Sequence, residues 1–137
     1  MENHFQLTDL EFEQQFKNCQ LAPELFSHEA HLRLAWININ KYGIEQAIES
    51  VCTQLNNYVT HLGATGKFNK TLTVAAVKAV YHFILKANFD TFEMFISRHP
   101  RLKYHFKELM DTHYGINIFS ERAKKEYIEP DLLPFNI

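Results

Sequence analysis

The sequence predicts an all-α protein, and three observations support this class. Hydrophobic residues make up 46% of the 137 residues, which is enough for one core in a chain of about one domain's length. Four glycines and four prolines leave little material for the turns of an all-β fold. Apolar residues also recur at the three-and-four spacing of a helix. We therefore expect residues 1–137 to form a single domain, a compact bundle of five to six helices with a central apolar fourth helix.

The first two expected helices are marked by their caps. A Thr-x-x-Glu capping box at residues 8–11 opens a helix over residues 8–18. Ser27 is well placed to cap a second helix that runs to Tyr42, where Gly43 supplies a left-handed stop.

The third and fourth expected helices form the middle of the chain. Residues 44–62 show the cleanest helical period. Residues 63–70 contain half of the glycines and predict a loop. Residues 71–86 are apolar almost all round, which is typical of a helix surrounded by others.

The C-terminal part predicts shorter elements. Residues 90–93 repeat the capping pattern for a short fifth helix, and residues 101–113 predict a sixth. A last helical turn begins at Ser120. Residues 130–137 are expected to form an apolar C-terminal strap across the bundle, because a free tail would be more polar.

Charge and cysteine content restrict the compartment and the partners. The net charge of -2 disfavours a general polyanion binder, so a nucleic acid is not the expected partner. Cys19 and Cys52 show no metal-binding spacing and suit a reducing compartment. Residues 1–4 are not followed by the apolar run of a leader sequence, and no stretch approaches eighteen uncharged apolar residues, so we expect neither secretion nor a membrane span. We expect a protein of the cytoplasm, and the resemblance described below implies a bacterial one.

Two histidines form the most pointed chemical pattern. His28 and His31 lie three residues apart in the first turn of the second expected helix, so they share a face. Neutral imidazole is a common metal ligand, and this spacing can serve one ion. The alternative is structural, with each ring bonded to a backbone carbonyl or to a neighbouring side chain.

A third histidine lies on the apolar fourth helix. His82 is in a segment where an unpaired polar ring is costly, so it needs a partner. It is either a third ligand or a core histidine bonded to Tyr58, Thr71 or Thr73.

Three short patterns give the chain a resemblance to a known family. Residues 26–32 read Phe-Ser-His-Glu-Ala-His-Leu, residues 67–73 read Lys-Phe-Asn-Lys-Thr-Leu-Thr, and residues 130–131 are Pro-Asp. In this order they resemble a family of small, uncharacterised, all-helical bacterial proteins. That family carries Phe-x-His-x-x-His-Leu, then Lys-Tyr-His-x-Thr-x-Thr, then an Ala-Arg-containing turn and a C-terminal Pro-Asp.

The resemblance implies one pocket and a change within it. His28, His31, residue 69 and Thr71 or Thr73 would converge on a single site. Asn69 stands where the family has a histidine, and an amide is a far poorer ligand for zinc or iron. The resemblance thus implies that a divalent transition metal would be bound only weakly at this site. Asn69 can still donate and accept hydrogen bonds, so a pocket for a small polar molecule survives.

Two hypotheses for function follow. In the first, His28, His31, Asn69, Thr71 and Thr73, with His82 behind them, form a pocket for a small molecule or a metal. In the second, the chain is a non-enzymatic helical interaction module or a homodimer, in which the histidines are structural. The patterns assign no reaction, so they leave open whether the protein is an enzyme.

Overall fold

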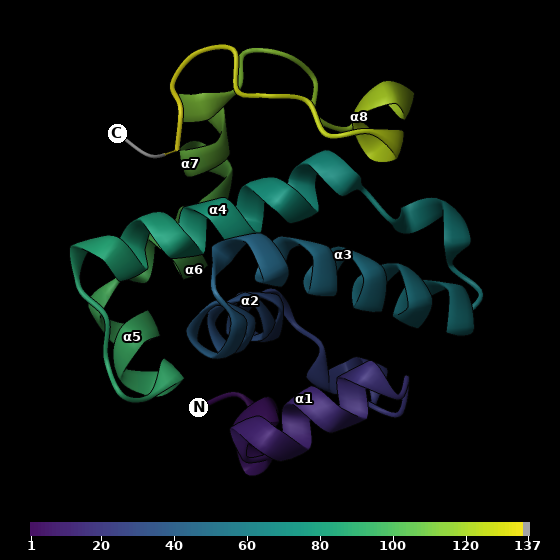
Figure 1. The fold of residues 1–137 in the computed structure, drawn as a ribbon, viewed down its shortest axis with the longest axis vertical. Helices are drawn as coiled ribbons and strands as arrows, with labels where there is room; N and C mark the ends of the chain where they lie inside the picture. The colour runs from purple at the N-terminus through teal and green to yellow at the C-terminus, as the bar shows by residue number, and fades with distance from the viewer. Residues whose placement is uncertain (136–137) are drawn as a thin grey trace. The chain divides into compact units, whose positions relative to one another are not determined.

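The structure is a computed structural model that describes residues 1–135. Within this range the chain forms eight α-helices, three 3-10 helices and no strand (Figure 1). The all-α class is therefore confirmed, and six of the α-helices have seven or more residues. The chain divides into two compact units, Met1–Phe68 and Asn69–Ile137. The single domain over residues 1–137 stays a prediction.

The first unit is built on two long helices. α2 packs along α3, and α1 contacts both. Its core contains a cluster of aromatic rings, in which Phe16 lies 4.8 Å from both Phe26 and Tyr58 between ring centroids. The buried Tyr58 hydroxyl donates to the Leu21 carbonyl at 2.8 Å. In chain order the elements are η1 (Asn3–Gln6), α1 (Asp9–Lys17), η2 (Pro23–Leu25), α2 (His28–Tyr42), α3 (Ile44–His61) and η3 (Thr65–Lys67).

The caps expected in the first unit are present. The Thr8 side chain accepts from the Glu11 amide, and the Glu11 carboxylate accepts from the Thr8 amide, which completes the capping box. The Ser27 hydroxyl accepts from the Ala30 amide at the start of α2. Gly43 ends α2 with φ +84, a conformation that side chains disfavour.

The second unit contains the remaining helices. α4 packs against α8, while α5 contacts α6 and α6 contacts α7. The His99 ring follows α5 and lies 5.1 Å from the Phe83 ring of α4. In chain order the elements are α4 (Lys70–Lys86), α5 (Phe92–Arg98), α6 (Pro100–Tyr104), α7 (Phe106–His113) and α8 (Glu121–Lys125).

α4 is enclosed along most of its length, as its apolar composition predicts. Only Lys70, Leu85 and Lys86 of this helix are exposed. Ala75 and Val80 are fully buried. The remaining positions are buried or half-buried, which matches the expected central helix.

The single helix expected over residues 101–113 was wrong. The backbone at His105, with φ -132 and ψ 33, separates α6 from α7. The expected loop over residues 63–70 contains the short η3, and the chain start forms η1, which the sequence analysis did not foresee.

The C-terminal segment contacts the end of α7. The amide of Leu132 donates to the carbonyl of His113, and Nδ1 of His113 donates to the Leu133 carbonyl at 2.6 Å. The Phe135 ring is buried and stacks on the His113 ring at 4.0 Å. Residues 136–137 of the expected strap lie outside the described residues.

Candidate functional site

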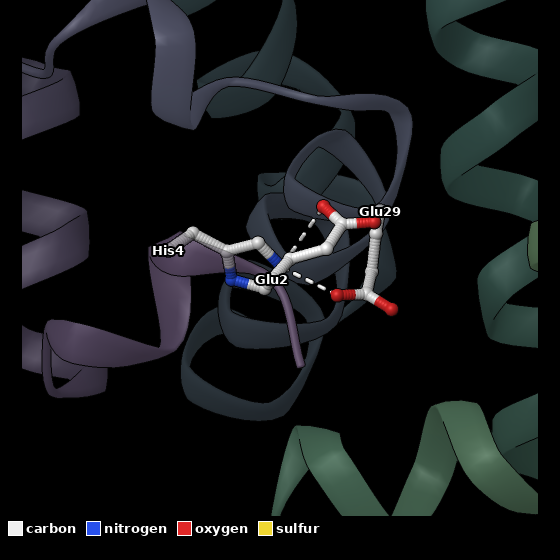
Figure 2. Close-up of side chains that lie close together, drawn as sticks. All are labelled: Glu2, His4 and Glu29. Carbon is white, nitrogen blue, oxygen red and sulfur yellow. Dashed lines mark hydrogen bonds and ion pairs between the residues drawn. The ribbon is translucent and has the colours of Figure 1, made fainter.

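The N-terminal segment and the first turn of α2 bring two carboxylates to one imidazole. Nε2 of His4 lies 2.7 Å from Oε1 of Glu29 and 3.8 Å from Oε1 of Glu2 (Figure 2). One potential metal-ligand atom from each residue, a ring nitrogen of His4 and a carboxylate oxygen of Glu2 and of Glu29, lies within 4.8 Å of the other two. His4 and Glu29 are buried, whereas the Glu2 side chain is 34% exposed. We call these three residues the His–Glu cluster, and its open side is at Glu2.

Hydrogen bonding determines which nitrogen of His4 carries the proton. Nη1 of Arg33 lies 3.3 Å from Nδ1 of His4. A guanidinium group can only donate, so Nδ1 accepts and the proton is on Nε2. Nε2 then donates to the Glu29 carboxylate at 2.7 Å. Burial lowers the pKa of His4, although the bond to Glu29 opposes this effect.

Arg33 fixes the N-terminal segment to α2. Its guanidinium group donates to the His4 carbonyl at 2.7 Å and to the Leu7 carbonyl at 2.8 Å. The same group donates to Oδ1 of Asp9 at 2.9 Å from Nη2 and at 3.2 Å from Nε. It also lies over the Phe12 ring, 4.8 Å from the centroid. This buried cation is therefore well paired, and it holds the backbone at His4 and Leu7.

Glu2 is held by the cap of α2. The Ser27 hydroxyl donates to Oε1 of Glu2 and accepts from the Ala30 amide. One serine thus caps the helix and positions a carboxylate of the His–Glu cluster.

The ligand types in the His–Glu cluster suit a divalent transition metal. Imidazole and carboxylate together bind zinc, iron and manganese. Such an ion lies roughly 2.0–2.2 Å from each ligand, so a tetrahedral site places ligand atoms about 3.3 Å apart. The 2.7 Å contact between His4 and Glu29 would open by about half an ångström, and the Nε2 proton would leave.

His28 and His31, which the sequence indicated, lie on the same turn of α2 as Glu29. Both residues are exposed. The His31 ring stacks on Phe26 at 3.7 Å, and its Nδ1 donates to the Ser27 carbonyl at 2.8 Å. The ring keeps an accessible edge, but the protein packed around it excludes water and lowers the pKa of His31.

Asn69 caps α4 and bonds to a distant carbonyl. Its Oδ1 accepts from the Leu72 amide at 3.0 Å, and its Nδ2 donates to the Ile118 carbonyl at 2.8 Å. Both ends of the buried amide are therefore bonded within the second unit.

Thr71 and Thr73 also bond to the backbone. The Thr71 hydroxyl donates to the Glu126 carbonyl at 2.9 Å and accepts from the Ile128 amide at 3.1 Å. The Thr73 hydroxyl donates to the Asn69 carbonyl one turn earlier, at 2.7 Å. Bonds of this kind are those that the structural hypothesis expects.

His82 has a backbone partner that the sequence analysis did not foresee. Its ring donates to the Phe135 carbonyl, which raises its pKa, but burial and the positive charge of Lys86 outweigh this and lower it. The residues of the pocket expected from the sequence thus fall in both units, with His28 and His31 in the first and the rest in the second. Their convergence on one pocket stays a prediction.

The His–Glu cluster itself was not predicted. His4 and Glu29 are 25 residues apart in the sequence, and no short motif connects them. Arg33 is the one feature of the sequence that could have indicated a contact here. It is a charged residue within the mostly apolar segment from Leu32 to Ile39 of α2, and a buried charge needs a partner elsewhere in the chain.

Comparison with known proteins gives no assignment: no family model, no curated protein and no solved structure matches the chain. The resemblance to the uncharacterised bacterial family stays a prediction. No helix in residues 1–135 has the length and hydrophobicity that crossing a membrane requires.

Proposed function

We propose that the protein binds one divalent transition metal ion at the His–Glu cluster. The observation that carries the proposal is that ligand atoms of Glu2, His4 and Glu29 lie within 4.8 Å of one another, two of them on buried residues. Two carboxylates and a neutral imidazole would together neutralise a doubly charged ion.

Three protein ligands leave at least one coordination position for water or a small molecule. That position would face the exposed side, at Glu2. A metal there could activate water or polarise a bound carbonyl group. The proposal therefore keeps the metal or small-molecule function expected from the sequence, but it moves the ligands from His28 and His31 to Glu29 on the same turn of α2 and to Glu2 and His4 of the N-terminal segment.

Zinc titration by calorimetry tests the proposal with matched variants. We expect His4→Gln and Glu29→Gln each to weaken zinc affinity at least about tenfold. The glutamine amide is a far poorer zinc ligand than the imidazole or the carboxylate that it replaces. Glu45→Gln is the control, since Glu45 is the second residue of α3 as Glu29 is of α2, and it is exposed. Equal affinity in His4→Gln and wild type would contradict the site.

The pocket expected from the sequence is a separate proposal that the same titration distinguishes. If His28 and His31 hold the ion, the His28→Gln/His31→Gln double variant loses zinc binding while Glu29→Gln keeps it. If the ion is at the His–Glu cluster, the reverse result is expected.

A non-enzymatic helical interaction module or homodimer, in which His28 and His31 are structural, is the second candidate. The bonds of Asn69 and Thr71 to backbone groups favour it for the second unit. In that case none of these variants changes zinc binding, and only His4→Gln and Glu29→Gln, at buried positions, lower the stability.

A further inference from the structure

Four large apolar side chains are exposed on two adjoining segments of the second unit. One segment, residues 114–120, connects α7 to α8, and the other is the C-terminal segment, residues 126–135. The Gly115 amide donates to Oδ1 of Asp131 at 2.8 Å, so the two segments lie side by side (Figure 1). A Cβ atom at position 115 would lie 3.0 Å from Asp131 and 3.5 Å from Leu132, so glycine allows this close approach. The exposed fractions range from 37% to 62% for Ile116, Phe119, Leu132 and Leu133, which we call the apolar patch.

The turn before α8 fixes the backbone of Phe119, the most exposed member of the apolar patch. Oδ1 of Asn117 accepts from the Phe119 amide at 2.9 Å, and the Asn117 carbonyl accepts from the Ser120 amide at 3.3 Å. The neighbouring Ile118 is buried, and its carbonyl accepts from Asn69. The exposed aromatic ring is therefore carried by an ordered turn, which lowers the entropic cost of binding a partner.

The backbone of the C-terminal segment is poorly suited to pairing with a strand of a partner. Pro130 and Pro134 have no amide hydrogen, and the amides of Leu132 and Leu133 both donate to the His113 carbonyl. A partner would therefore contact the side chains of the apolar patch instead of adding a strand. An amphipathic helix binds in this way, through an apolar stripe on one face.

The charges beside the apolar patch leave an excess of carboxylates. Two of the three basic residues of α8 are paired with acidic side chains, Arg122 with Glu126 and Lys124 with Glu121. Glu129 and Asp131 lie just before Leu132 in the sequence and are exposed, and within residues 1–135 neither is in an ion pair. A partner with lysine or arginine beside its apolar face complements these carboxylates. Two copies that met through this patch would instead bring like charges together.

The apolar patch is also too small for a permanent homodimer. Obligate homodimers bury roughly 1,000 Å² or more on each copy, about 65% of it apolar. A completely exposed aromatic side chain offers only roughly 150–250 Å², and the four side chains of the patch are at most 62% exposed. An area of this size suits a single helix.

We propose that the apolar patch binds an amphipathic helix of a partner protein, whose apolar stripe is bordered by lysine or arginine. Phe119 would be the central aromatic contact, and Glu129 and Asp131 would pair with the basic residues at the edge. The site is independent of the metal proposal, because it shares no residue with the His–Glu cluster.

Fluorescence anisotropy with two model peptides tests the shape and the charge of the partner. The first probe is a labelled 15-residue peptide of leucine and lysine, with leucine at helical spacing on one face. The second has the same pattern with glutamate in place of lysine. We expect saturable binding of the leucine–lysine peptide and binding of the leucine–glutamate peptide that is at least about tenfold weaker. No saturable binding of the leucine–lysine peptide, or equal binding of the two, would overturn the proposal.

Variants of exposed residues confine the effect to the apolar patch. We expect Phe119→Ser to weaken binding of the leucine–lysine peptide at least about tenfold. Leu85→Ser is the matched control, because Leu85 is 63% exposed near the end of α4 and should leave binding unchanged. We expect Glu129→Gln to weaken binding about threefold at low salt, whereas Glu93→Gln, at an exposed position of α5, should not. A loss in Leu85→Ser as large as that in Phe119→Ser would overturn the proposal.

Two further measurements distinguish other occupants of the same patch. Sedimentation equilibrium of wild type and Phe119→Ser tests for a second copy of the chain, and we expect both to be monomers at the concentrations of the binding assay. Sedimentation with vesicles of phosphatidylcholine and phosphatidylglycerol tests for a lipid surface, and we expect no difference between the two proteins. Self-association or vesicle binding that Phe119→Ser abolishes would overturn the proposal.

Discussion

Nη1 of Arg33 donates to the backbone carbonyl of His4 at 2.7 Å and lies 3.3 Å from Nδ1 of the same residue. One guanidinium group therefore sets both the position of the N-terminal segment and the tautomer of its histidine. Nε2 of His4 is left to donate to Glu29. The predictions below for Arg33→Lys, for His4→Gln and for the proton position on His4 depend on this relationship.

Arg33→Lys should destabilise the protein by about 3 kcal/mol, because an ammonium group cannot reproduce the bonds to the His4 and Leu7 carbonyls and to Asp9. Urea unfolding measures the loss. Arg98→Lys, at an exposed position, is the control. A loss for Arg33→Lys no larger than that of the control would show that Arg33 does not anchor the N-terminal segment.

Stability should fall as the pH drops below the ordinary histidine pKa of 6.5. Folding lowers the pKa of His4, His31 and His82, so the folded protein binds fewer protons than the unfolded chain. The stability from these groups is complete above pH 6.5 and is lost as the pH falls through their folded values. Unfolding free energies between pH 7.5 and 5 measure this loss.

His4→Gln should make that pH dependence shallower, because one of the three groups is removed. His61→Gln is the control, since His61 is exposed at the end of α3. An identical slope in His4→Gln and wild type would mean that His4 does not contribute.

Thr71→Val should lower the stability by roughly 1–3 kcal/mol, since it leaves the part-buried Glu126 carbonyl and Ile128 amide without the buried hydroxyl that bonds to both. Thr73→Val should cost less, because the Thr73 hydroxyl bonds only to a carbonyl of its own helix end. Thermal or urea unfolding compares the two. A larger loss for Thr73→Val would contradict the bridging role of Thr71.

Asn69→His should destabilise the protein by about 2 kcal/mol. An imidazole cannot reproduce both the helix cap and the bond to the Ile118 carbonyl. Unfolding and zinc titration of this variant separate two accounts. Lower stability with unchanged zinc affinity supports a structural Asn69, whereas a gain in zinc affinity supports the pocket that the family resemblance implies.

Local signals made much of the fold predictable from the sequence. Thr8, Ser27, Thr91 and Ser120 each cap a helix through their own side chains, and Gly43 ends one through its backbone conformation. These effects act within one turn, so a short segment reveals them. The break at His105 has no such signal, since neither glycine nor proline lies there and the flanking residues keep a helical period.

The candidate site was less predictable because it depends on tertiary contacts. Glu29 was visible only as a neighbour of His28 and His31, and its partner His4 is 25 residues away on a 3-10 helix with no periodic pattern. Asn69 and Thr71 were expected to line a ligand pocket, which stays a prediction, and their hydrogen bonds to the backbone were not foreseen. Their partners, Ile118 and Glu126, are 49 and 55 residues away, which the sequence alone does not indicate.

The proton position on His4 tests the central claim most directly. Long-range ¹H–¹⁵N correlation spectra, assigned by comparison with His4→Gln, distinguish the two ring nitrogens of His4. Without metal, we predict a protonated Nε2 and an unprotonated Nδ1. With one equivalent of zinc, Nε2 should become metal-bound and the proton should move to Nδ1, which requires Nη1 of Arg33 to leave Nδ1 while it keeps its bond to the His4 carbonyl. A His4 ring whose nitrogens are unchanged by zinc would contradict metal binding at the His–Glu cluster.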